Sequence, residues 1–187
     1  MSSQPEFKPV SFSKTTITEL MIPAYANFGG KVHGGTILSL MDKIAYVCSS
    51  KHAGTYCVTV SVDGVEFLRP VEVGNLISLH ASVNFVGKSS LIVGIKAVAE
   101  DIKHRHENHT NTSYFTMVAM GDDLKPAQVP GLILEDDEDV RRFIKSKIRR
   151  DFKQAKRKEL EAEIERLQNS KDLSILDGEN CMIASSI

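Results

Sequence analysis

Apolar residues between positions 36 and 52 recur with the period of an amphipathic helix. They follow intervals of three and four residues, the spacing that puts side chains on one helix face. The members of this stripe are Ile37, Leu40, Met41, Ile44 and Cys48. We expect a helix from Thr36 to about His52, stopped by Gly54. Asp42 lies about 140° from Ile37 around this helix. It therefore faces water or a second packing partner.

Five other segments alternate apolar and polar residues, or are rich in β-branched residues, as strands do. Turn signals such as Gly87-Lys88 and Gly121-Asp122-Asp123 separate several of them. The predicted strands are Thr15–Ile22, Tyr56–Val62 continued by Val65–Leu68, Asn75–Val86, Ser90–Glu100 and Thr112–Met120, with Asp101–Asn111 as a polar loop.

Short connections between strands indicate antiparallel pairing. The helix has nowhere to bury its apolar stripe except against that sheet. We therefore predict an α+β fold with one antiparallel sheet wrapped around one central helix.

The composition changes after residue 133, where an acidic run at Glu135–Asp139 precedes a basic stretch from Arg141 to Lys158. Acid at the start of a helix and base further on suit the helix dipole. We expect a flexible N-terminus over 1–13, one domain over 14–133, a charged helix over 134–169 and a loose tail over 170–187.

The net charge of −1 gives the chain no general attraction to nucleic acid or to an anionic membrane. Cys48, Cys57 and Cys181 lack metal-ligand spacing, and no apolar run is long enough to span a bilayer. A soluble cytoplasmic protein without membrane insertion is the expected class.

The stretch from Asn27 to Asp42 carries the candidate chemistry. A polar amide precedes a glycine-rich approach, the Gly34-Gly35 pair opens the helix, and a carboxylate follows two turns later. A helix N-terminus tolerates anions, and glycine lets the backbone approach a ligand closely. These groups suit attack on an activated carbonyl.

Residues 27–42 resemble the hotdog-fold acyl-CoA thioesterases, the single-domain bacterial acyl-CoA hydrolases and the vertebrate cytosolic acyl-CoA hydrolase. The similarity runs from about Thr15 to Leu132. The motifs that support it, in order, are Asn27, His33-Gly34-Gly35-Thr36-Ile37-Leu38, Asp42, Val58–Asp63, Phe67–Val71, Val73-Gly74-Asn75, Gly87–Ser90 and Val129-Pro130. The vertebrate relatives carry two such domains in tandem.

The resemblance implies a hotdog fold whose protomers pair edge to edge as a homodimer, and whose dimers assemble further, often as a hexameric trimer of dimers. The active sites then lie between protomers. Asp42 is implied as the general base or the nucleophile, and Asn27 from the opposing protomer as the residue that orients water or the thioester carbonyl. The same likeness implies substrate contacts for His33, Gly34, Gly35, Arg69, Gly87, Lys88, Ser89 and Ser90.

Two other patterns have simpler interpretations. His104, His106 and His109 lie in a predicted polar loop without a further ligand set, so we expect no metal site. The basic stretch from Arg141 is interrupted by Asp151 and followed by glutamates, which indicates a salt-bridged helix and no nucleic-acid partner, although a phosphate-binding role for some of its cations stays open.

The expected function is hydrolysis of acyl-CoA to a carboxylic acid and coenzyme A, in fatty acid metabolism. No cofactor is expected, because coenzyme A is part of the substrate and product. Two alternatives remain, which are hydrolysis of acyl-carrier-protein thioesters and a non-catalytic acyl-CoA-binding module. Acyl chain length is not determined by the sequence.

Overall fold

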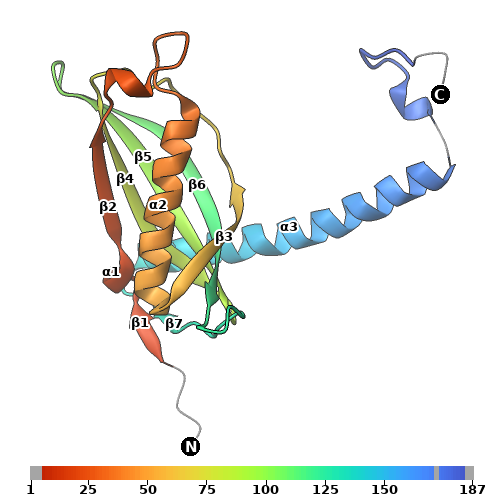
Figure 1. Cartoon of the computed structure of the whole chain (residues 1–187). Coiled ribbons are helices and arrows are strands. Elements are labelled where there is room, and N and C mark those ends of the chain that lie inside the picture. Colours follow the sequence, from red (N-terminus) through yellow and green to blue (C-terminus); the bar gives the residue numbers. More distant parts are fainter. Residues whose placement is uncertain (1–5, 171–172, 184–187) are drawn as a thin grey trace, which may run out of the picture. The chain divides into compact units, whose positions relative to one another are not determined.

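The computed structural model describes residues 6–170 and 173–183. The chain forms two compact units, one up to Ser146 and one from Lys147. The first unit holds the sheet and the central helix (Figure 1).

The main sheet of the first unit is five-stranded and antiparallel, with the order β2-β4-β5-β6-β3. It curls around α2, as Figure 1 shows. The predicted α+β hotdog architecture is therefore confirmed. Its strands are β2 (Thr15–Leu20), β3 (Tyr56–Asp63), β4 (Leu76–Val86), β5 (Ser90–Asp101) and β6 (His106–Met120).

The central helix α2 spans Gly34–Ala53, so it begins two residues before the predicted start. Gly54 ends it with a left-handed φ of 75°, a conformation that glycine adopts without a steric penalty. The whole predicted apolar stripe is buried against the strands, and Asp42 is exposed on another side of the helix.

The core lies between α2 and the inward face of the sheet. Residues that alternate along β4 and β5 are buried on that face, and Phe115 and Met117 of β6 complete it. The intervening residues of these strands point to the opposite face. The alternating core residues are Ile77, Leu79, Ala81 and Val83 of β4 and Leu91, Val93, Ile95 and Ala97 of β5.

Two predicted elements differ in the structure. Residues 65–68 do not continue β3, because Gly64 (φ 70°) turns the chain, and Leu68 N–H then bonds to the carbonyl of Thr110. The predicted polar loop 101–111 is much shorter, since β6 begins at His106 and Glu107 pairs with Glu100. Backbone pairing continues there because the polar side chains do not oppose it. Most of them are exposed up to His109, and the buried Thr110 and Asn111 donate to the carbonyls of Ala97 and Glu66.

The segment 6–13, expected to belong to a flexible N-terminus, contains β1 (Phe7–Pro9) and the short α1 (Val10–Ser13). β1 pairs in parallel with β7 (Gly131–Ile133), and Val10 and Ser13 are buried. Residues 1–5 lie outside the described part. A short η1 turn (Pro23–Tyr25) follows β2.

The charged helix α3 spans Asp137–Ser170 and carries acidic residues in its first turn. Its first part belongs to the first unit, where the Phe143 ring lies 5.2 Å from the Phe85 ring and Ser146 is buried. The predicted tail contains the turn η2 (Ser174–Leu176), and 171–172 and 184–187 lie outside the described residues.

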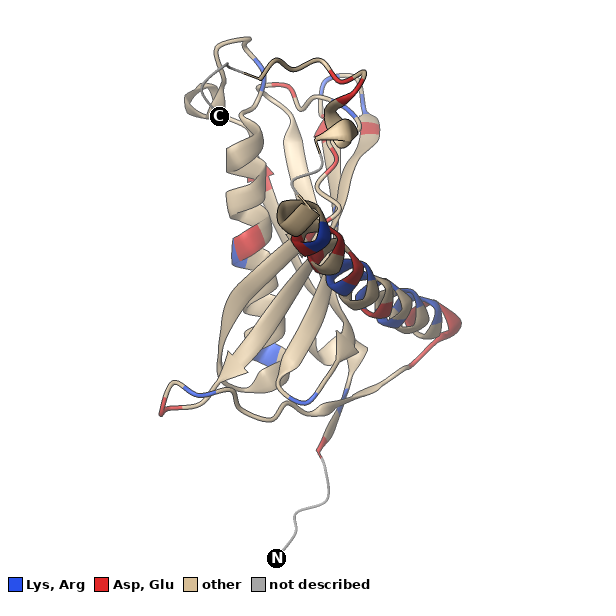
Figure 2. Cartoon of the chain, turned by 90° about the vertical axis from the view of Figure 1, so that its right-hand side faces the viewer, with Lys and Arg blue, Asp and Glu red and all other residues tan. Residues whose placement is uncertain are grey.

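Beyond Ser146, α3 bears interleaved charges of both signs (Figure 2), with ion pairs such as Lys147–Asp151 and Arg157–Glu161. Pairs four residues apart stabilise a helix. Among the described residues, no helix is long and apolar enough to cross a membrane.

Candidate active site

Asp42 is held by a hydroxyl group from the edge strand. The Thr59 hydroxyl of β3 donates a hydrogen bond of 2.6 Å to Asp42 Oδ1. Asp42 Oδ2 has no hydrogen-bond partner in residues 6–170 and 173–183. One oxygen therefore fixes the carboxylate, and the other is open to a water molecule or a substrate.

Sequence reasoning did not single out Thr59 as a site residue, although it lies in the recognised Val58–Asp63 motif. Its side chain and that of Asp42 are both exposed. Threonine is common in strands, so the sequence gives Thr59 no special role. Its role is apparent only when α2 is packed against β3. No local signal in the sequence pairs positions 42 and 59.

Asn27 lies in a tight loop that its own side chain stabilises. Its Oδ1 accepts hydrogen bonds from the N–H groups of Gly29 (2.8 Å) and Lys31 (3.1 Å). These two donors identify Oδ1 as the oxygen and leave Nδ2 on the other side of the amide. Asn27 is exposed, and its Nδ2 has no partner in the described part of the chain. The free group is thus a hydrogen-bond donor.

The N-terminus of α2 is capped by His33, whose Nδ1 accepts the N–H of Gly35 at 2.9 Å. A side chain at 35 would come within 2.8 Å of this ring nitrogen, and one at 34 within 3.2 Å of the Phe67 ring. A side chain at 35 would therefore displace the His33 cap, and one at 34 would require a small shift of the exposed Phe67 ring. The cap uses the N–H of Gly35, which was expected to face a ligand. The N–H of Gly34 is the backbone donor still available at the start of the helix.

Arg69 lies at the same end of the sheet as the α2 N-terminus. Its Nη1 donates to Asn108 Oδ1 at 2.5 Å, and Val71, two residues on, accepts the Val32 N–H. The guanidinium is exposed and fixed beside the helix entry.

The turn Gly87–Ser90 lies at the other end of the sheet. It joins β4 to β5, with Gly87 N–H bonded to the carbonyl of Ser90 and Val129 N–H to that of Lys88. At the start of β4, the carbonyl of Asn75 accepts a hydrogen bond from the N–H of Met21, which precedes the loop that leads to α2. The length of β4 therefore separates this turn from Asn27, Gly34 and Arg69 within one chain.

Asn27 and Asp42 are also separated along the molecule. His33 precedes Asp42 by nine residues of α2, about 13 Å along the axis at about 1.5 Å per residue. Around Asp42 the surface is apolar and exposed, and β3 is an edge strand of the sheet. The exposed apolar residues on α2, β3 and the flanking loops are Phe28, Tyr46, Val47, Tyr56, Val60, Val62, Phe67 and Leu68.

An unpaired edge beside exposed apolar side chains is a surface that soluble proteins normally cover. Within one chain, Asn27 and Asp42 are therefore not brought together. Within the described residues, no group of three or more His, Cys, Asp or Glu side chains is placed to hold a metal ion.

A sheet curled around one helix, with a carboxylate two turns into that helix, is the arrangement expected of a hotdog thioesterase. The profile of the Thioesterase superfamily matches residues 29–104. The chain is 46% identical over 131 residues to protein VdlD of Helicobacter pylori, a match that covers 70% of this chain and 75% of that protein.

Among solved structures, the acyl-CoA hydrolase of Staphylococcus aureus in complex with butyryl coenzyme A and coenzyme A superposes with a TM-score of 0.77. The two are 33% identical, and the match covers 87% of this chain and 99% of that one. A hexameric acyl-CoA thioesterase gives a TM-score of 0.78 at 29% identity, with 81% and 97% coverage. The chain belongs to the acyl-CoA hydrolases of the thioesterase superfamily.

The staphylococcal hydrolase has also been solved as three alanine variants, of an asparagine, an aspartate and a threonine. Those three residues are spaced along that protein as Asn27, Asp42 and Thr59 are spaced here, with each number one higher.

Proposed function

We propose that this acyl-CoA hydrolase family member cleaves acyl-CoA to a carboxylic acid and coenzyme A, with Asp42 as the general base. The observation that carries the proposal is the Asp42 carboxylate, exposed and fixed through one oxygen by Thr59. A thioester is already an activated acyl group, so one carboxylate and an oxyanion site are enough for its hydrolysis.

In the reaction, Asp42 Oδ2 takes a proton from a water molecule whose oxygen attacks the thioester carbonyl carbon. The carbonyl π electrons move to its oxygen. When the tetrahedral intermediate collapses, the C–S bond breaks and the protonated Asp42 returns its proton to the leaving sulfur. The products are a carboxylic acid and free coenzyme A, and the enzyme is regenerated.

The oxyanion is stabilised by donors that have no other partner among the described residues. Asn27 offers Nδ2, because its Oδ1 is occupied by the N–H groups of Gly29 and Lys31. Gly34 offers its N–H at the positive end of α2. His33 does not contact the oxyanion in this proposal. Its ring nitrogen accepts the N–H of Gly35 and so fixes the start of the helix.

Two protomers complete one site in this proposal. Antiparallel pairing of two β3 edges would set their α2 helices antiparallel and bring the N-terminus of one helix toward Asp42 of the other. It would cover the exposed apolar residues around β3 and supply Asn27 from the opposing protomer. The hexameric relative supports further assembly as a trimer of dimers.

The phosphates of coenzyme A are anionic, and its pantetheine arm is neutral and polar. We assign the contacts of both to Arg69 and the turn Gly87–Ser90. These groups lie at opposite ends of one chain's sheet. A contact with both ends by one substrate therefore requires the two-protomer site. Cationic side chains and hydroxyls are suitable partners for phosphate.

The decisive experiment measures thiol release from acyl-CoA substrates whose acyl chains have about two to sixteen carbons. It compares wild type, Asp42→Asn and Asp42→Ala. Asp42→Asn keeps the size of the side chain and removes the base. We expect turnover to fall at least a hundredfold in both variants while coenzyme A binding is kept. Binding without wild-type turnover would indicate a non-catalytic module. Turnover only on acyl-carrier-protein substrates would indicate the other hydrolase class.

Direct attack by Asp42 is the alternative chemistry at the same residue. It would form an acyl–aspartyl anhydride and release coenzyme A before water enters. Turnover in ¹⁸O-labelled water, followed by mass spectrometry of the Asp42 peptide, tests for this route. Label in Asp42 would establish direct attack with water entering at the aspartyl carbonyl, because general-base catalysis places no water oxygen on the carboxylate.

The dimer is tested with Val60→Lys, a charge placed on the exposed edge strand. We expect a smaller mass in light scattering and a loss of turnover, with Lys103→Gln on the distant β5–β6 turn as the control. A monomer that keeps full activity would refute the shared site. Operation without a metal or redox cofactor, and a cytoplasmic location, stay predictions.

A further inference from the structure

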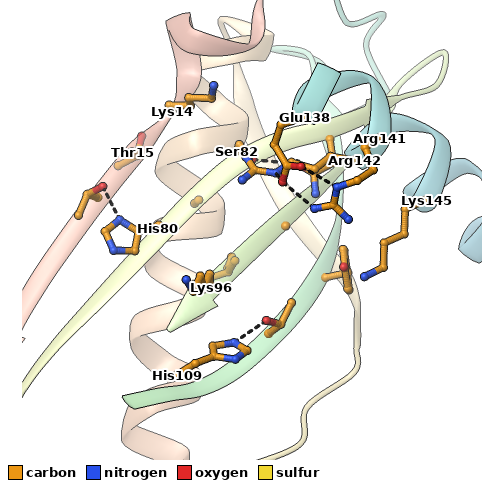
Figure 3. A pocket seen from close by; sticks show the side chains of 17 residues that line it. Lys14, Thr15, His80, Ser82, Lys96, His109, Glu138, Arg141, Arg142 and Lys145 are labelled. Atoms are coloured by element: carbon orange, nitrogen blue, oxygen red, sulfur yellow. Dashed lines mark hydrogen bonds and ion pairs between the residues drawn. The ribbon is translucent and has the colours of Figure 1, made fainter. Parts of the chain in front are cut away.

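A cavity of about 680 Å³ lies on the sheet face opposite to α2. Its walls come from β2, β4, β5 and β6 and from the first turns of α3, all within the first unit (Figure 3). The volume is in the range of small-molecule pockets in proteins. None of the candidate active-site residues lines it.

The floor of the cavity is built from two buried polar side chains of β4. Ser82 and Asn84 are each only 6% exposed. The Ser82 hydroxyl donates to Asn84 Oδ1 at 2.8 Å and accepts from Arg142 Nη1 at 3.5 Å. The Asn84 oxygen is thereby engaged, and its Nδ2 has no hydrogen-bond partner within the described stretch.

Gly94 of β5 makes room for that amide nitrogen. A Cβ atom at position 94 would collide with Asn84 Nδ2. This nitrogen is not one of the fully buried atoms that lack a partner, so solvent reaches it and the donor is available to an acceptor that enters the cavity.

The walls are strongly cationic. Hydrogen bonds from Arg141, and then from Arg142, lower the pKa of Glu138 to about 2, so this carboxylate stays ionised and offsets one arginine. Lys14 is paired with the buried Asp139 at 3.4 Å. With these two carboxylates counted, three positive charges remain in excess among Lys14, Lys96, Arg141, Arg142 and Lys145.

Docking of α3 on the sheet accounts for some of these charges but not for all. The Lys14–Asp139 ion pair and the hydrogen bond from Arg142 to Ser82 attach the helix, whereas Glu138 pairs with Arg141 and Arg142 within α3 itself. Lys96 and Lys145 have no carboxylate partner in the described residues. Lys145 Nζ instead lies 5.8 Å from the centre of the Tyr114 ring.

We propose that this cavity binds a small anion with at least two phosphate groups. A diphosphate carries about the three charges that are in excess, and arginine and lysine donors suit its oxygens. One phosphate oxygen accepts from the unpartnered Asn84 amide at the floor, and Lys96 and Lys145 close over the anion from opposite walls. The site is separate from the thioesterase site and does not depend on its chemistry.

Isothermal titration calorimetry with inorganic pyrophosphate on the full-length protein tests the proposal. We expect one site per chain and weaker binding as salt is raised. Lys96→Gln and Lys145→Gln should each weaken binding about tenfold, and Lys103→Gln, which removes a lysine outside the cavity, should not. Asn84→Asp keeps the acceptor for Ser82 and places a negative charge at the floor, so it should abolish binding. Acyl-CoA hydrolysis reports that each variant is folded.

Titration with ADP distinguishes two sources of the diphosphate. Tighter binding than pyrophosphate identifies a nucleotide as the ligand, and equal or weaker binding identifies the free anion. The proposal is overturned if neither probe binds or if the cavity variants bind like wild type. It is also overturned if pyrophosphate fails to bind and Lys96→Gln changes the assembly mass, since the face is then a contact between copies.

Discussion

The replacement Asn27→Asp separates two roles that the Asn27 side chain combines. Its Oδ1 accepts two backbone N–H groups and so shapes the loop, and its Nδ2 is the donor assigned to the oxyanion. Aspartate keeps an oxygen for the loop and loses the donor. Alanine loses both groups.

The expected magnitudes follow from these contacts. Loss of one oxyanion donor lowers kcat by about 100- to 1,000-fold, or about 3–4 kcal/mol of transition-state stabilisation. Each loop hydrogen bond contributes about 1 kcal/mol to stability. We therefore expect Asn27→Asp to lose turnover with an almost unchanged Tm, and Asn27→Ala to lose a similar amount of turnover and about 1–2 kcal/mol of stability as well.

The assays are steady-state thiol release for kcat and KM, and thermal unfolding of the same samples. Light scattering confirms that each variant keeps its assembly. Near-normal turnover in Asn27→Asp together with a strong loss in Asn27→Ala would refute the donor role and show that Asn27 acts only as a loop residue.

Three further predictions concern α2 and its contact with β3. Thr59→Val should lower kcat about tenfold or more, because it removes the hydrogen bond to the Asp42 carboxylate, while Thr59→Ser should keep most activity; equal activity in the two variants would contradict this. Gly35→Ala should destabilise the protein by about 1 kcal/mol, measured by urea unfolding, because its Cβ displaces the His33 cap. Burial lowers the pKa of His52 below its usual 6.5, so the unfolded chain binds more protons below that pH. Stability should therefore fall as pH drops below about 6.5, and a His52→Gln variant should flatten the fall.

The helical period and the strand alternation were reliable where one side of an element is buried. The stripe from Ile37 to Cys48 is buried as predicted, and the position of Asp42 off that stripe follows from the same period. The pattern was wrong at residues 65–68, which are largely exposed, and at 106–111, where a paired strand carries polar residues that are exposed at first and buried at Thr110 and Asn111. Hydrophobicity does not report on pairing in either case.

The candidate site also has residues that the sequence predicts and contacts that it does not. The residues Asn27, Gly34, Gly35 and Asp42 are visible in a short contiguous stretch, because glycines, an amide and a carboxylate are informative at that spacing. The contact of Thr59 with Asp42 and the Nδ1 cap of His33 on Gly35 depend on where β3 and the loop lie in space. The direction in which Asn27 presents its donor also depends on the folded loop.

The sequence by itself determined the class of fold, the central helix and the candidate base, since these rest on periodicity and on a local motif. Only the tertiary structure showed which groups are still available to a ligand, because hydrogen bonds between distant segments use up some donors and leave others. The cavity under α3 depends entirely on this. Its floor from β4, the space that Gly94 leaves for the Asn84 amide and its lysines from β5 and α3 come from separate segments that meet only when the sheet is formed.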